Sequence, residues 1–351
     1  MKSELLQIIE DDCHSVTENS VSSLSTLRDT CILVTGGTGF IGVWIAELIT
    51  FLNKNYQFNT RLILLSRRAN SLSLTAPHLA NLKNVTLIEK DILMAVDIPS
   101  EVNWIVHAAG TPDNRIHASE PLRTMNTIIN GTDTILSACT RLPNLQKFLN
   151  ISSGLVYGVQ SWETNKISES FRGVAEFSSI NSAYVESKRV AETICAVYRN
   201  QHRLPITNAR PFAFIGPHQL LDRPWAINNF IRDALLGENI RILGDGNTIR
   251  SYMYPSDMAF WLINCLLHGS VGASYNIGNP VGISLYQLAL KIADNVHPRP
   301  KIVSRLSEDN VANTSKLIPD TTLAERSFSL KLTVDLDTAI KRTILWNQLA
   351  N

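Results

Sequence analysis

A glycine-rich turn between an apolar run and a helical segment constrains this 351-residue chain more than any other feature. The turn occupies residues 35–42 (TGGTGFIG); the apolar run Ile32–Val34 precedes it, and Phe40–Phe51 follows with helical periodicity. Its glycines, spaced GxxGxxG, are Gly36, Gly39 and Gly42. This spacing permits a tight turn, close approach of the backbone to a pyrophosphate and close helix–strand packing, while the helix N-terminus favours an anion. The segment therefore predicts a dinucleotide-binding site.

Short apolar runs alternate with helical segments along the first half of the chain. The further runs that we expect to be buried strands are Arg61–Leu65, Val85–Ile88, Trp104–His107 and Phe148–Ile151. Between the last two runs, Leu122–Leu142 has the periodicity of a helix. Such alternation is typical of βαβ units. The sequence therefore predicts an α/β fold with a Rossmann-type doubly wound parallel sheet.

The composition of the chain changes after Arg210, where prolines and glycines interrupt it. The elements expected there are helices at Trp225–Leu236, Ser256–Leu267, Ser284–Val296 and Asp335–Leu349 and a short strand at Ile240–Leu243. We interpret this part as a smaller C-terminal α/β lobe over the strand ends, where open α/β sheets bind ligands. The predicted division is an appendage (1–30), a dinucleotide-binding domain (31–210) and a substrate lobe (211–351), whose segments can interleave with the sheet domain. The appendage can pack on the body or on a partner subunit.

The end of the second predicted strand bears on the choice of dinucleotide. It is followed by Ser66, Arg67 and Arg68, where an acidic side chain would bind the adenosine ribose and favour NAD. A hydroxyl and two guanidinium groups instead suit the extra phosphate of NADP. We therefore expect NADP, with NAD as the alternative. Asp91, after the third strand, is either a partner for the adenine amine or an ordinary turn residue.

Three residues form a candidate proton-transfer group. Tyr184 and Lys188 are four residues apart in a predicted helix, so their side chains project from one face. An ammonium group beside a phenol favours the phenolate and lowers the pKa of the tyrosine. The Ser153 hydroxyl can hydrogen-bond the same substrate oxygen. Together with a dinucleotide cradle, this group predicts hydride transfer at a carbon that bears a hydroxyl or a carbonyl.

Composition and charge disfavour other classes of protein. A hydrophobic content of 44% fits a globular protein with a substantial core, and a formal net charge of +1 gives no reason to expect a nucleic-acid surface. The five cysteines lack CxxC spacing, so we expect neither a metal site nor a disulfide framework, and place Cys31, Cys139 and Cys195 in the core. The start of the chain lacks a secretory pattern and no apolar run has membrane-spanning length, so we expect a cytoplasmic enzyme that does not bind membranes.

The order of these motifs resembles that of the extended short-chain dehydrogenase/reductase family, in its nucleotide-sugar epimerase/dehydratase branch. The resemblance runs from about Cys31 to near the C-terminus. The motifs that carry it are TGGTGFIG at 35–42, HAAG at 107–110, SSGLVYG at 152–158, YVESK at 184–188, RPFAFIGP at 210–217, ILGDGNTIRSYMYPSDMA at 242–259 and YNIGNP at 275–280. The resemblance implies a nicotinamide cofactor, a nucleotide-sugar substrate and a homodimer through a four-helix interface, here residues 122–142 and 181–201 of each subunit.

The resemblance also assigns roles to single residues. Ser153 matches the residue that polarises the sugar oxygen, Tyr184 the acid/base, and Lys188 the residue that binds the nicotinamide ribose and tunes the tyrosine. Arg250 matches a position that contacts substrate phosphates; the alternative is a surface arginine at a strand end. The expected cofactor contacts are Gly36, Gly39, Phe40, Ile41, Gly42, Ser66, Arg67, Arg68, Asp91, Ile92, Ala108, Ala109, Gly110, Tyr184, Lys188 and Pro211. The expected substrate contacts are Ser153, Gly154, His218, Asn228 and Arg250, although His218 can instead make structural hydrogen bonds.

The chain departs from its apparent family beside Ser153. Gly154 and Leu155 stand where the 4,6-dehydratases carry an Asp-Glu pair, and neither side chain can carry a proton. Sugar-acid decarboxylases use a glutamate nearby, which Leu155 cannot replace. Ala213 and Ile128 stand where asparagines are frequent. Because Gly154 and Leu155 carry no carboxylate, dehydration and decarboxylation are disfavoured.

Oxidation, reduction or epimerisation of a ring carbon remains, with C4 the first candidate. The arginines after the second strand and the missing acidic pair favour NADPH-dependent reduction of a nucleotide-linked 4-keto-6-deoxyhexose, a step in deoxysugar synthesis. The alternatives are NAD(P)-dependent 4-epimerisation of a nucleotide sugar and a non-catalytic dinucleotide sensor built on the same fold.

Overall fold

Helices cover both faces of a central sheet, and the burial of its first strand shows this directly. The computed structural model describes residues 3–110, 113–173, 178–304 and 315–350. All residues of β1 (Cys31–Thr35) are buried. Ile32 and Val34 join a core on one face of the sheet, whereas Cys31 and Leu33 join a core on the other face. Because a strand that is buried on both faces needs apolar side chains on both, its sequence is a nearly continuous apolar run, as found here.

The central sheet is parallel and has the strand order β11-β6-β5-β4-β1-β2-β3. Its other strands are β2 (Arg61–Ser66), β3 (Val85–Glu89), β4 (Trp104–His107), β5 (Lys147–Ile151), β6 (Ile206–Pro211) and β11 (Ser274–Ile277). The order reverses between β1 and β4, which is where open α/β sheets bind their ligands. The predicted doubly wound α/β fold is confirmed.

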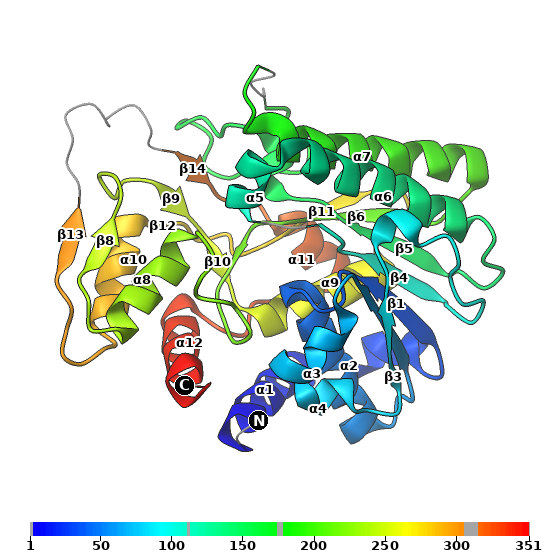
Figure 1. The fold of residues 1–351 in the computed structure, drawn as a ribbon, viewed down its shortest axis with the longest axis horizontal. Coiled ribbons are helices and arrows are strands. Elements are labelled where there is room, and N and C mark those ends of the chain that lie inside the picture. Colours follow the sequence, from blue (N-terminus) through cyan, green and yellow to red (C-terminus); the bar gives the residue numbers. More distant parts are fainter. Residues whose placement is uncertain (1–2, 111–112, 174–177, 305–314, 351) are drawn as a thin grey trace.

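Two pairs of long helices enclose this sheet (Figure 1). One face carries α2 (Phe40–Tyr56) and α9 (Pro255–His268), and the other carries α6 (Pro121–Cys139) and α7 (Ser182–His202). The short elements between them are η1 (Val21–Leu27), η2 (Ala69–Ser71), α3 (Leu72–Thr75), α4 (Pro77–Ala80), η3 (Ile92–Met94), α5 (Asn114–Ser119) and η4 (Gly154–Tyr157). The three cysteines expected in the core, Cys31, Cys139 and Cys195, all lie in it.

A second, smaller core belongs to the C-terminal part of the chain. Its elements are β7 (Ala213–Phe214), α8 (Ala226–Leu235), β8 (Ile240–Ile242), β9 (Ile249–Arg250), β10 (Tyr252–Met253), β12 (Ile283–Ser284), α10 (Leu285–Ala293), β13 (Ile302–Ser304), β14 (Lys316–Leu317) and α12 (Leu336–Ala350). Three segments from within the predicted lobe return to the sheet domain: α9 packs on α2, β11 pairs with β6 at the sheet edge, and α11 (Thr322–Phe328) packs on α9 and β11. The chain thus passes between the two parts several times.

The N-terminal segment packs on the body of the protein. Helix α1 (Ser3–Thr17) lies against α2, α9 and α12 and adds apolar side chains to the main core. Its Asp12 is fully buried; the carboxylate accepts a 2.6 Å hydrogen bond from the Tyr254 hydroxyl and pairs with Arg342 of α12. This cluster ties the first helix to the last. Among the helices of the described residues, none is both long and apolar enough to cross a membrane.

Replacing Asp12 with alanine should lower the free energy of unfolding by about 2–4 kcal/mol, because it leaves Tyr254 and Arg342 without their buried acceptor. Urea unfolding followed by circular dichroism measures this change. The neighbouring Asp11 is the matched control, since its carboxylate is exposed and bonds only Gln7 within the same helix. Asp11→Ala should change the free energy by less than about 0.5 kcal/mol. Equal effects of the two variants would show that the cluster does not stabilise the fold.

Candidate active site

The glycine-rich turn lies directly on the end of β4. Gly36 has φ +68°, and a Cβ built there would stand 2.6 Å from the Ala108 carbonyl oxygen. A Cβ on Gly42 would stand 2.5 Å from the carbonyl oxygen of Gly37. The amide of Gly37 donates a 3.1 Å hydrogen bond to the carbonyl of Leu65 in β2. Glycine is therefore required by close contact as well as by conformation, and the helix N-terminus is left accessible to a pyrophosphate.

The end of β2 lies beside this turn. The hydroxyl groups of Ser66 and Thr38 are 2.8 Å apart, and the side chains of Arg67 and Arg68 are exposed. Asp91 accepts a 3.0 Å hydrogen bond from the amide of Leu93 and begins η3. The structure thus offers hydroxyl and guanidinium groups after β2, and gives Asp91 the turn role that was one of its two sequence interpretations.

His107 at the end of β4 is a buried structural residue, as expected. Burial lowers its pKa to about 3, so the ring is neutral. Nδ1 lies 2.8 Å from the Thr35 hydroxyl and Nε2 lies 3.2 Å from the Thr132 hydroxyl. Because Thr132 donates its own proton to the carbonyl of Ile128, Nε2 is the protonated nitrogen. These hydrogen bonds hold the end of β4, which Ala108, Ala109 and Gly110 follow in the chain.

Ser153 and Tyr184 meet at the carboxyl end of β5. Ser153 follows the strand, and its oxygen accepts a 3.1 Å hydrogen bond from the amide of Leu155, which begins η4. Tyr184 lies in the first turn of α7, close enough to Ser153 for that hydroxyl to act against the rise of the tyrosine pKa. Both side chains are more than nine-tenths buried. The structure therefore brings together the two groups that were predicted to act on one oxygen.

Lys188 lies one turn further along α7 but does not contact the Tyr184 hydroxyl. Its ammonium donates a 2.7 Å hydrogen bond to the carbonyl of Ile151 and stands 6.0 Å from the centre of the tyrosine ring. Burial lowers the pKa of Lys188 to about 8. Burial also raises the pKa of Tyr184, against the hydrogen bond from Ser153. The expected lowering of the tyrosine pKa was therefore wrong, because desolvation outweighs the hydrogen bond from Ser153.

His117 is a member of the site that the sequence did not reveal. It belongs to α5, and its ring stacks on that of Tyr184 with centres 4.2 Å apart and planes 12° apart. No motif or periodicity marks this histidine, because α5 is a short helix in a connection without apolar spacing. Only the folded chain shows the contact.

Several other residues that were predicted to contact the cofactor or the substrate make structural contacts of their own. Gly154 packs under the ring of Phe212, Pro211 ends β6, and Ile92 packs against Gly131. Asn228 donates to the carbonyl of Leu220 and holds the loop before α8. Arg250 lies in the lobe, where its guanidinium donates to the backbone and side-chain oxygens of Ser315.

His218 is not in the sugar pocket that one sequence interpretation gave it. Its Nε2 lies 2.9 Å from a carboxylate oxygen of Glu47 in α2, and the ring is buried beside Trp44 and Trp346. His218 has φ +65°, and its side chain lies against α2. The structural alternative for this residue is the one observed.

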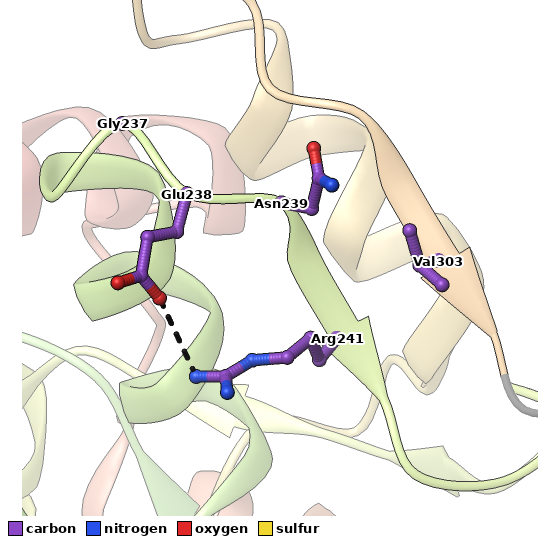
Figure 2. Close-up of a pocket in the computed structure, with 5 residues that line it drawn as sticks. All are labelled: Gly237, Glu238, Asn239, Arg241 and Val303. Carbon is purple, nitrogen blue, oxygen red and sulfur yellow. Dashed lines mark ion pairs between the residues drawn. The ribbon is translucent and has the colours of Figure 1, made fainter.

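A surface hollow of about 520 Å³ lies elsewhere, on the lobe (Figure 2). The residues that line it are Gly237, Glu238, Asn239, Arg241 and Val303. Its Arg241 is paired with Glu238 at 3.6 Å and with Asp233 at 2.8 Å, so its polar groups already have partners. Across the described ranges, no cluster of three or more His, Cys, Asp or Glu residues could hold a metal ion. The Ser153–Tyr184 pair therefore remains the candidate centre.

Known proteins resemble the chain over most of its length. A profile of the NAD dependent epimerase/dehydratase family matches residues 32–278. UDP-glucuronic acid decarboxylase 6 of Arabidopsis thaliana is 31% identical over 82% of this chain and 80% of its own length. UDP-glucuronic acid decarboxylase 1 of Xenopus tropicalis is 28% identical over 89% of this chain and 71% of its own length. The structure of UDP-glucuronic acid 4-epimerase from Bacillus cereus, with UDP-glucuronic acid and NAD, has a TM-score of 0.77 at 23% identity and covers 92% of this chain and 100% of its own. That structural likeness shows a shared fold.

Gly36→Ala should abolish dinucleotide binding. The new methyl group would overlap the Ala108 carbonyl, in addition to about 1–2 kcal/mol of strain from the positive φ. Isothermal titration with NAD and NADP measures the binding. Gly237→Ala is the matched control, since Gly237 has φ +72° with nothing within 4 Å of the added Cβ. It should show the strain alone and bind the dinucleotide normally; binding by Gly36→Ala at wild-type affinity would show that the turn is not the site.

Proposed function

The chain belongs to the NAD-dependent epimerase/dehydratase family of enzymes, and we propose that it is a nucleotide-sugar oxidoreductase that transfers hydride at C4 of the sugar. The observation that carries the proposal is the meeting of Ser153 and Tyr184 at the carboxyl end of β5, with Lys188 one turn away. Strand β5 neighbours β4, on whose end the glycine-rich turn lies. A hydroxyl-bearing carbon held by Ser153 would therefore lie between the acid/base and the cofactor cradle.

The turn fits a dinucleotide, because its glycines leave open the space that a Cβ would fill. Gly36, Gly39 and Gly42 would hold the pyrophosphate, while Ser66, Arg67 and Arg68 would hold the adenosine end. The exposed guanidinium groups after β2 support NADP over NAD. When bound, the nicotinamide supplies or accepts the hydride.

The protonation state of the site supports reduction as the direction of reaction. Because burial raises the pKa of Tyr184, the phenol is protonated before the substrate binds. Tyr184 would give its proton to the oxygen at C4, and Ser153 would hold that oxygen by a hydrogen bond. Lys188 is charged below about pH 8 and would stabilise the phenolate that remains. We therefore propose NADPH-dependent reduction of a nucleotide-linked 4-keto-6-deoxyhexose.

Epimerisation at C4 is the second candidate. It uses the same residues and is supported by the structural likeness to the Bacillus cereus 4-epimerase. Decarboxylation, the reaction named for the curated relatives, is not proposed, because Gly154 and Leu155 offer no carboxylate beside Ser153. The substrates of this chain thus need a direct assay.

A product assay separates these reactions. The purified enzyme would be given NADPH or NADH with a UDP-linked 4-keto-6-deoxyhexose, and NAD or NADP with UDP-glucose and UDP-glucuronic acid. We expect NADPH to be consumed in equal amount to the deoxysugar formed, as measured by absorbance and mass spectrometry. Interconversion of epimers without net use of the cofactor would replace the first candidate by the second, and a pentose product from UDP-glucuronic acid would contradict both.

Tyr184→Phe should lower kcat by about 10²–10⁴-fold, because it removes the proton that reaches the C4 oxygen. Dinucleotide affinity should stay within a few-fold of wild type, since the ring remains. Tyr198→Phe, on the outer part of the same helix, is the control. Its hydroxyl bonds Asp133, away from Ser153, so turnover should be unchanged. Turnover by Tyr184→Phe at the wild-type rate would refute the assignment.

We also propose a homodimer through α6 and α7. These helices pack along each other and expose apolar side chains, among them Leu122, Val190 and Val197. Val190 and Val197 are seven residues apart and share one face of α7. Val197→Glu should therefore give a monomer in sedimentation velocity, whereas Val271→Glu, at an even more exposed position outside these helices, should not. A monomeric wild-type protein at micromolar concentration would contradict the proposal.

A further inference from the structure

The Tyr184 ring is held between two different surfaces. On one side it packs with Ile128 of α6 and with Ala191 of its own helix. On another, the flat ring of His117 stacks on it at 4.2 Å and 12°. The apolar side chains fill space but do not determine the plane of the tyrosine ring. A parallel ring at this distance restricts both the rotation of the tyrosine ring about its own axis and the tilt of that axis. His117 therefore limits where the hydroxyl can point.

His117 is itself fixed by the chain around it. Its amide donates a 3.1 Å hydrogen bond to the carbonyl of Asp113, and the Asp113 side chain accepts a 3.0 Å hydrogen bond from the amide of Arg115 at the start of α5. The buried Asp113 carboxylate also accepts a 3.1 Å hydrogen bond from Arg223. Arg223 lies in the loop before α8, so the Asp113 carboxylate joins the start of α5 to that loop. The short helix that carries His117 is therefore anchored at its N-terminal end.

We propose that His117 is a positioning residue: its ring sets the plane of Tyr184, and so keeps the tyrosine hydroxyl at Ser153 for proton transfer to the sugar oxygen. The inference rests on the acid role proposed for Tyr184. It assigns no proton transfer to His117, and the property that matters is the flat ring. A ring of the same shape should therefore replace it.

Three substitutions of His117 distinguish the effect of a flat ring from the effect of the ring nitrogens. His117→Phe keeps a flat ring without ring nitrogens, His117→Leu fills similar volume without a plane, and His117→Ala removes both. With NADPH and a UDP-linked 4-keto-6-deoxyhexose, the leucine and alanine variants should lose roughly 10–100-fold in kcat, because small misplacement of a reacting group has effects of this size. KM for both substrates should change less than about twofold, since uniform binding is untouched. His117→Phe should return to within about threefold of wild type.

The chain supplies a matched control for these variants. His202 also contacts a tyrosine, Tyr198, with ring centres 5.2 Å apart, but on the exposed far part of α7. His202→Ala should leave kcat and KM unchanged. Wild-type kcat in His117→Leu, a loss in His117→Phe equal to that in His117→Ala, or a change in KM alone would each overturn the positioning role.

A second measurement keeps this test independent of turnover. Fluorine NMR of 3-fluorotyrosine protein, with the signal of residue 184 assigned from Tyr184→Phe, reports the ring environment directly. The signal should move and broaden in His117→Leu and keep its wild-type position and width in His117→Phe; an unchanged signal in the leucine variant would overturn the inference. If wild-type protein leaves NADPH unused while the NMR result holds, the proposed reaction fails and the positioning of Tyr184 by His117 stands.

Discussion

The contact between the glycine-rich turn and the end of β4 is the constraint on which the site depends. Gly36 meets the Ala108 carbonyl without room for a methyl group, and the turn is bonded to the backbone of β2 through Gly37. The neutral His107, bonded to Thr35 and Thr132, holds the strand beneath it. Because the turn, β4 and β5 are thus fixed relative to one another, Ser153 at the end of β5 stands at a set distance from whatever the turn binds.

Burial gives this site its chemical character. An ammonium group and a phenol lie out of water on one helix, so the pKa of Lys188 falls and that of Tyr184 rises. The two pKa values move apart from their ordinary values of 10.5 and 10.0, so the phenol keeps its proton until a substrate oxygen takes it. The residues after Ser153 add no competing acid or base, since Gly154 only accommodates the ring of Phe212. Positions 154 and 155 therefore place no carboxylate beside Ser153.

Sequence patterns predicted strands β1 to β5, the long helices and the residues at those strand ends, because each is set by local spacing. Strands β6 and β11 were not predicted, because polar residues interrupt their apolar pattern. Strand β1 is apolar up to Thr35 and Gly36 precedes a helix, and both facts are readable without the fold. Contacts between distant segments could not be read in this way. His117 meets Tyr184 across 67 positions of the chain, and His218 meets Glu47 across 171 positions. The direction of the Tyr184 pKa was also missed, because desolvation depends on what covers a side chain and not on its neighbour in the helix.

The return of the chain from the lobe to the sheet has a consequence for biosynthesis. Strand β11 completes the sheet beside β6, yet β7, α8, β8, β9 and β10 all lie between these two strands in the sequence. During translation the edge of β6 must wait, unpaired, until most of those residues have emerged from the ribosome. An open strand edge attracts other chains. Premature termination before Ser274 should therefore leave an aggregation-prone fragment. Because the segments of the two parts alternate in the sequence, neither part can be replaced as one uninterrupted stretch of chain.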